Sequence, residues 1–159
     1  MKFIYTFLIL TFSISLTFAC SCSKVGILKG QNKSDFVFTG KVVEIKEIIT
    51  KEKLTDTEKI VDYKRYEFIF EIKHIHKRKK GFNYSERITI ITTGGGTDCG
   101  NKFDLNKEYL VYAFNQQNKI GWGIEDQKAE KEFMSTNLCT RTKRVSFFTF
   151  WEQLILELT

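Results

Sequence analysis

The chain has 159 residues, with 25 basic and 19 acidic side chains, a net charge of +6 and four cysteines. This length is enough for one domain that buries about two thirds of its unfolded surface. The sequence contains no internal repeat, no proline and no linker long enough to divide it, which excludes a chain of several domains.

The N-terminal residues predict an export signal. Met1 and Lys2 form a short positive start, residues 3–18 are almost wholly apolar, and Ala19 ends this run with a small side chain. We therefore expect a signal peptide over residues 1–19 and a secreted, periplasmic or cell-surface domain over residues 20–159. Two alternatives remain open, namely lipidation of the new N-terminal cysteine and an uncleaved anchor. The anchor is disfavoured because the run is shorter than the ~20 residues of a spanning helix.

All four cysteines follow this leader: Cys20, Cys22, Cys99 and Cys139. In an exported chain they predict two disulfides. A bond between Cys20 and Cys22 would close a very tight, strained ring. The expected pairings therefore join the N-terminus to both later cysteines, and two such pairings are open. A four-thiolate zinc site is a less favoured alternative, because no Cys-x-x-Cys spacing is present and the compartment is oxidising.

The elements that follow are mostly strands. A short, mildly amphipathic helix is expected at residues 23–31. β-Branched and aromatic residues in alternation then predict strands, separated by polar or glycine-rich segments such as residues 50–60. These strands are expected at 34–49 with a bend or bulge at Gly40, and at 61–76, 86–93, 108–114 and, more briefly, 119–124. In the second strand one face is expected to carry Tyr66, Phe68, Phe70, Ile72 and His74.

The last residues predict an amphipathic helix over 149–158. Phe150, Leu154 and Leu158 recur at a spacing of four, and Thr149 with Glu152 forms a capping-box pattern. The polar positions carry acids rather than lysines, which favours core packing of the apolar stripe over a membrane-surface role. Together the elements predict an all-β fold, a five-stranded OB-fold-like β-barrel with a short N-terminal helix and a C-terminal amphipathic helix.

Four short motifs in a fixed order resemble one family. They are Cys20-Ser21-Cys22 at the mature start, residues 34–42 (SDFVFTGKV), residues 99–112 with their CG, F, L and KEYLVY positions, and residues 139–142 (CTRT). Their order is similar to the netrin-like domain of the tissue inhibitors of metalloproteinases, including bacterial-type single-domain members, over most of the mature chain. The resemblance implies the five-stranded OB barrel and the disulfides Cys20–Cys99 and Cys22–Cys139.

The resemblance also implies a function, inhibition of zinc metalloendopeptidases. The α-amino nitrogen and carbonyl oxygen of Cys20 would chelate the catalytic zinc of the target protease, beside Cys22. Ser21 would enter the specificity pocket, and Thr97 with Asp98 would form a second edge of the contact. The chemistry is reasonable, because a catalytic zinc keeps one position open and an α-amine with a pKa of ~7.7–8 loses its proton at little cost. A terminus held by two disulfides also loses little entropy on binding.

The chain departs from the animal inhibitors in three respects. It has no proline after the second cysteine and no cysteines for a third disulfide, and we expect it to lack their second, C-terminal domain. The alternative is therefore a non-inhibitory secreted or lipid-anchored binding or structural module, in which the cysteines only attach the N-terminal segment to the barrel. A membrane partner is expected only if Cys20 is lipidated. Export argues against a nucleic-acid partner, and we expect neither an enzyme nor a cofactor.

Three other features of the sequence are interpreted as structural rather than functional. His74 and His76 stand two apart, a spacing that can bind a metal, but no third ligand is evident and we interpret them as a half-buried strand end. The cations of residues 73–80 are expected to form a solvated hairpin that protects a strand edge, with polyanion binding as the alternative. The glycine run 94–96 lacks the Lys-Ser/Thr of a phosphate loop and is expected to turn the backbone beside a disulfide.

Overall fold

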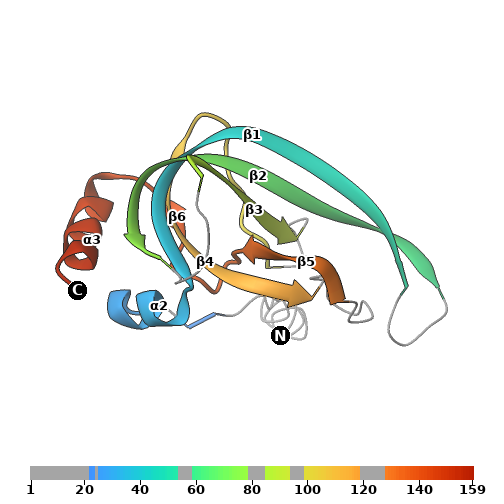
Figure 1. Cartoon of the computed structure of the whole chain (residues 1–159), viewed down its shortest axis with the longest axis horizontal. Coiled ribbons are helices and arrows are strands. Elements are labelled where there is room, and N and C mark those ends of the chain that lie inside the picture. The colour runs from blue at the N-terminus through green and yellow to red at the C-terminus, as the bar shows by residue number, and fades with distance from the viewer. Residues whose placement is uncertain (1–21, 24, 54–58, 79–84, 94–98, 119–127) are drawn as a thin grey trace, which may run out of the picture.

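The computed structural model describes residues 22–23, 25–53, 59–78, 85–93, 99–118 and 128–159 (Figure 1). Two short helices accompany six strands in this part of the chain. In chain order they are α2 (Ile27–Lys33), β1 (Phe36–Lys53), β2 (Ile60–Lys77), β3 (Arg87–Thr93), β4 (Glu108–Asn118), β5 (Lys128–Ser135), β6 (Lys143–Arg144) and α3 (Phe147–Glu157). None of the helices described is long and apolar enough to cross a lipid bilayer.

Five strands close into a ring. The sheet order is β1-β2-β3-β5-β4-β6, and an additional pairing of β1 with β4 returns the sheet to its first strand. All pairings are antiparallel except that of β3 with β5. β1 and β2 continue beyond the other strands as a two-stranded ribbon (Figure 1). The predicted all-β, OB-fold-like arrangement with a short helix near each end is confirmed.

The inside of the ring is a core of aromatic and branched side chains. Phe103 lies at its centre, with ring centroids 4.9 Å from Phe68, 5.1 Å from Phe70 and 4.8 Å from Tyr109. These pairs meet edge to face, the arrangement that aromatic quadrupoles favour. The other buried members of the core are Phe36, Phe38, Val42, Ile90, Val111, Ala113 and Met134.

The predicted irregularity at Gly40 is confirmed, and it changes which side chains of β2 face the core. The β1–β2 register shifts between Thr39 and Gly40. A Cβ at Gly40 would lie 2.9 Å from a main-chain oxygen of β2, so only glycine fits this close approach. Beyond the shift, Ile75 packs on the core while His74 is exposed. The prediction that His74 shares one face of its strand with Phe68 and Phe70 is therefore wrong, because a bulge moves the alternation by one residue.

Element boundaries differ from the predictions in two places. Residues 50–53, predicted as loop, continue β1, and β4 extends to Asn118. The fifth strand of the ring is β5, Lys128–Ser135, whereas the fifth strand predicted at 119–124 lies outside the described residues. β5 was missed because Lys, Glu and Ala, which dominate its sequence, are depleted in strands. Pairing with β4 and β3 stabilises this segment as a strand, although its own residues disfavour one.

Helix α3 begins two residues earlier than predicted and has a different cap. Ser146 is the N-cap, and the Thr149 hydroxyl accepts a hydrogen bond from the Ser146 backbone N–H at 2.8 Å. Ser146 and Thr149 therefore form the capping box, and the predicted pairing of Thr149 with Glu152 is wrong. Glu152 instead faces the sheet with 3% of its surface exposed.

The orientation of α3 is opposite to the predicted one. Thr149, Glu152 and Leu156 are buried against the sheet. The apolar stripe that was expected to pack there is exposed, with 60% of Phe150, 42% of Leu154 and 79% of Leu158 accessible to solvent. Only Leu156 joins the small apolar cluster beneath the helix, which contains Val37, Leu110 and Tyr112. The polar groups beneath the helix pair with the carboxylate of Glu152, so the face that carries this acid packs on the sheet.

Candidate functional site

The described residues nearest the predicted protease contact form one edge of the molecule. We call it the N-terminal edge and define it as Cys22, Cys99–Gly100 and Asn137–Thr142. A disulfide joins Cys22 to Cys139, with a Cα–Cα distance of 5.1 Å that is ordinary for such a bond. This is the pairing that the family resemblance implies for these two cysteines, and it holds the first described residue of the chain against the loop before β6.

Four of the predicted contact residues lie outside the described part of the chain: Cys20, Ser21, Thr97 and Asp98. The glycine run 94–96 lies outside it as well. Cys99 is disulfide-bonded, but its predicted partner Cys20 is one of the residues that the structure does not describe. The Cys20–Cys99 bond and the chelating terminus therefore stay predictions.

The Cys99 and Cys139 segments lie side by side. The Leu138 N–H donates a hydrogen bond to the Cys99 carbonyl oxygen at 2.8 Å, and Gly100 forms an antiparallel bridge with Asn137. Gly100 is required here because a Cβ would lie 2.2 Å from the Thr93 carbonyl oxygen. Together with the disulfide, these contacts bring three segments that are distant in sequence to one edge.

Asn137 organises the turn that carries Cys139. Its side-chain oxygen accepts a hydrogen bond from the Cys139 N–H at 2.9 Å, and its carbonyl oxygen accepts from the Thr140 N–H at 3.0 Å. Asn101, which is buried, donates to the same carbonyl oxygen at 2.9 Å. The hydroxyl groups of Thr136 and Thr140 lie 2.7 Å apart below the turn. Hydrogen bonds of these polar groups therefore hold the turn in place.

Arg141 connects the N-terminal segment to α3. Its Nη1 donates to the Val25 carbonyl oxygen at 2.6 Å, while Nε and Nη2 donate to the two oxygens of Glu152 at 2.6 and 2.9 Å. The Tyr112 hydroxyl also donates to Glu152, at 2.7 Å, and Lys143 pairs with the same carboxylate. Burial alone would raise the pKa of Glu152, but the hydrogen bonds from Arg141, Lys143 and Tyr112 outweigh it and hold that pKa below its ordinary value.

Sequence reasoning did not identify this arrangement. Arg141 belongs to the CTRT motif of the resemblance, and Glu152 was assigned to a capping box, but nothing local to either residue indicates that the two are paired. Their contact depends on how α3 packs on the sheet. The only signal was an acid in the middle of a largely apolar helix, which burial makes expensive unless a cation accompanies it.

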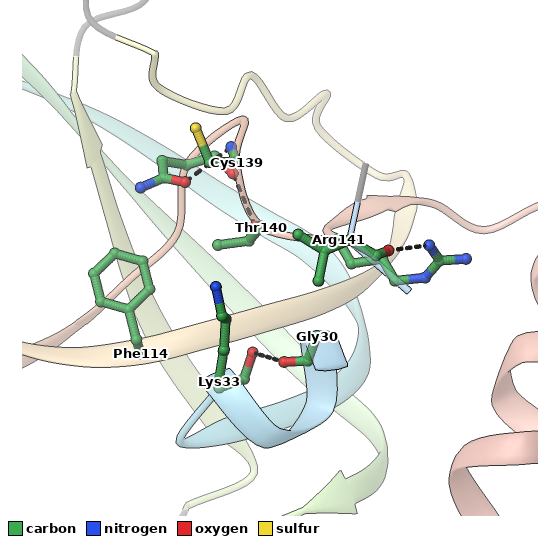
Figure 2. Close-up of a pocket in the computed structure, with 9 residues that line it drawn as sticks. Gly30, Lys33, Phe114, Cys139, Thr140 and Arg141 are labelled. Atoms are coloured by element: carbon green, nitrogen blue, oxygen red, sulfur yellow. Dashed lines mark hydrogen bonds between the residues drawn. The ribbon is translucent and has the colours of Figure 1, made fainter. Parts of the chain in front are cut away.

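A small cavity lies behind the edge, between α2 and the turn that carries Cys139 (Figure 2). Its volume is about 240 Å³, below the 300–1,000 Å³ that is usual for pockets binding small molecules. Figure 2 shows the Lys33 amine directed into it between Phe114 and Arg141. We interpret the cavity as space left under the edge, and the edge itself as the candidate site.

Comparison with known proteins gives no family. No protein-family model matches the chain, and no curated protein matches it at a significant level.

Proposed function

We propose that the chain is an exported inhibitor of zinc metalloendopeptidases, with the N-terminal edge as its contact surface. The observation that carries the proposal is the gathering of three segments at this edge. The Cys22–Cys139 disulfide and the hydrogen bond from Leu138 to Cys99 place the start of the described chain beside both later cysteines. A zinc-binding terminus needs such support, because a slack terminus loses more entropy on binding.

The reactive group in this proposal is the α-amine of Cys20 together with its carbonyl oxygen. They form a five-membered chelate on the open position of the target's catalytic zinc and displace its water. Binding releases the amine proton, so affinity falls as pH drops below the pKa of the amine. Ser21 enters the specificity pocket, and Thr97 with Asp98 forms the neighbouring edge. The contact of Arg141 with Val25 supports the segment from behind.

The test begins with the intact mass of the exported protein, which identifies the first residue and any lipid. The mature protein, starting at Cys20, is then assayed against a panel of zinc endopeptidases. One alanine added before Cys20 should abolish inhibition, because it removes the amine from the zinc without touching the fold. One alanine added after Thr159 is the matched control and should change nothing. Inhibition that survives the N-terminal addition would contradict the chelation mechanism.

A second candidate function is favoured by the exposed face of α3. It is a membrane-surface module, in which α3 rather than a lipid on Cys20 contacts the bilayer. Six large apolar side chains of the helix are exposed to solvent, together with Leu158 directly after it. The six are Phe147, Phe148, Phe150, Trp151, Leu154 and Ile155. Phenylalanine, tryptophan and leucine on one face are typical of helices that lie in the headgroup region of a bilayer.

The acids on this helix were expected to disfavour a membrane surface, but in the structure both of them contact basic side chains or a histidine. Glu152 is buried and paired with cations, and Glu157 contacts His74 at 2.9 Å. The nearest charge before the helix is the exposed Arg144, and the chain carries +6 overall. The occupant that fits these charges is an anionic lipid surface.

Vesicle sedimentation tests this candidate. The protein should bind phosphatidylglycerol-rich vesicles more tightly than phosphatidylcholine vesicles, and less tightly at high salt. A Phe148→Ser, Trp151→Ser double variant should lose binding, whereas Leu105→Ser, which changes a half-exposed leucine away from α3, should not. Equal binding by all three proteins would exclude α3 as the contact.

A further inference from the structure

Both histidines of the chain and one carboxylate meet beside α3. His74 and His76 are the only two histidines in the sequence, and both lie near the end of β2. Glu157, the last residue of α3, completes the group, and the three possible ligand atoms all lie within 4.8 Å of one another. We propose that this His–His–Glu cluster is a binding site for a divalent transition metal ion, with Zn²⁺ as the best fit. The site is separate from the N-terminal edge and does not depend on the proposed inhibition.

His76 provides the strongest evidence. Its side chain is fully buried, and its Nδ1 has no hydrogen-bond partner among the described residues. A buried polar atom without a partner costs about 1–3 kcal/mol and requires an explanation. Nδ1 faces a Glu157 oxygen 4.0 Å away, a gap in which a cation would satisfy both atoms.

The neighbours of His76 assign its tautomer. Nε2 lies 2.9 Å from the Thr39 hydroxyl, and that hydroxyl donates its own proton to the side-chain oxygen of Gln153 at 3.4 Å. With the Thr39 proton on Gln153, Nε2 carries the ring proton and donates it to Thr39, which leaves Nδ1 with a free lone pair. Metal-binding histidines are typically oriented in this way, by a hydrogen bond from the other ring nitrogen.

The separations fit a tetrahedral ion after small movements. Ligands about 2.0–2.2 Å from zinc lie about 3.3–3.5 Å from one another. The His74 Nε2 to Glu157 distance is 2.9 Å, and the His76 Nδ1 to Glu157 distance is 4.0 Å. The side chains of His74 and Glu157 are half exposed, so they can adjust around the buried His76 and leave a fourth position for water. Two imidazoles with one carboxylate suit zinc and its neighbours rather than Ca²⁺ or Mg²⁺, which prefer oxygen ligands.

The fold explains why these residues meet. Between Thr39 and Gly40 the β1–β2 register shifts, and the strand beyond it turns His74 and His76 away from the core, so that their ring centroids lie 4.7 Å apart. Helix α3 packs over this part of β2 with its C-terminal turn, which supplies Glu157. The sequence shows the histidine pair, but the third ligand comes from another element and only the tertiary structure identifies it.

Calorimetric titration of the untagged, disulfide-intact protein with ZnCl₂ tests the site. We expect one Zn²⁺ per chain and no comparable binding of Ca²⁺. His74→Ala and Glu157→Gln should each weaken zinc binding at least tenfold. Thr39→Val should weaken it by about ten- to a hundredfold, because it removes the group that orients His76. Glu44→Gln is the matched control, since this carboxylate is half exposed on β1 and distant from the cluster, and it should bind like the wild type.

Imidazole NMR spectra supply a second readout that is independent of affinity. Because the chain has only two histidines, zinc should shift both sets of ring signals together and in proportion to occupancy. Far-UV circular dichroism of each metal-free variant verifies its fold. Absence of zinc binding in the wild type would overturn the proposal. So would zinc binding that is unchanged by His74→Ala and Glu157→Gln, or zinc binding that leaves the histidine signals unmoved.

Discussion

Replacing Glu152 with glutamine tests whether this acid holds α3 on the sheet. The carboxylate is 3% exposed and accepts hydrogen bonds from Tyr112 and Arg141, beside Lys143. Hydrogen bonds to a charged group contribute about 1.5–3 kcal/mol each. Arg141 and Lys143 are 26% and 36% exposed, so water compensates part of their loss. We therefore expect Glu152→Gln to lower the free energy of unfolding by about 2–4 kcal/mol.

The effect should depend on pH in a defined direction. The folded-state pKa of Glu152 lies below the ordinary value of 4.5. A carboxylate whose pKa is lowered by folding contributes stability above its unfolded pKa, and this contribution is lost as pH falls through the folded value. The difference between wild type and Glu152→Gln should thus be largest near neutrality and shrink below about pH 4.

Urea unfolding followed by far-UV circular dichroism measures these differences. The control is Glu47→Gln, which removes an exposed carboxylate paired with Lys64 at 2.8 Å and should leave the unfolding midpoint unchanged within error. A double-mutant cycle with Tyr112→Phe should show coupling, because the tyrosine hydroxyl and Glu152 share one hydrogen bond. A loss below about 1 kcal/mol, or one that is the same at neutral and acid pH, would refute the reasoning.

Three further predictions concern packing and covalent links. Leu156→Ala should lower the free energy of unfolding by about 2–4 kcal/mol and Leu154→Ala by less than about 1 kcal/mol, since the first side chain is 2% exposed and the second 42%. If urea unfolding gave the reverse order, α3 would pack by its apolar stripe. Replacing Cys22 and Cys139 together with serine should cost about 5 kcal/mol, because the disulfide closes a loop across a separation of 117 residues, and a loss below about 2 kcal/mol in the same assay would contradict that estimate. Gly100→Ala should lower the melting temperature by several degrees, because the new Cβ would lie 2.2 Å from a carbonyl oxygen; an unchanged melting temperature would disprove this contact.

Much of the β-structure was predictable because its signal is local. Alternating β-branched and aromatic residues identified β1 to β4, and a glycine inside a strand pattern identified the irregularity at Gly40. β5 escaped because its own composition disfavours a strand, and two neighbouring strands stabilise it instead. The candidate edge was predicted in part, through the cysteines, whereas the roles of Asn137 and Arg141 depend on contacts with distant segments.

The amino-acid sequence alone determined that the chain is mostly β-structure, where four strands and the last helix lie, and that its cysteines follow an apolar run of residues. These are properties of short windows, in which periodicity and side-chain type act directly on the backbone. Only the tertiary structure decided which face of α3 packs, because Arg141, Lys143 and the Tyr112 hydroxyl all pair with Glu152. The same packing placed Glu157 beside His74 and His76. A helix with an apolar stripe and an acid on the opposite face can dock by either side, and the partner surface selects between them.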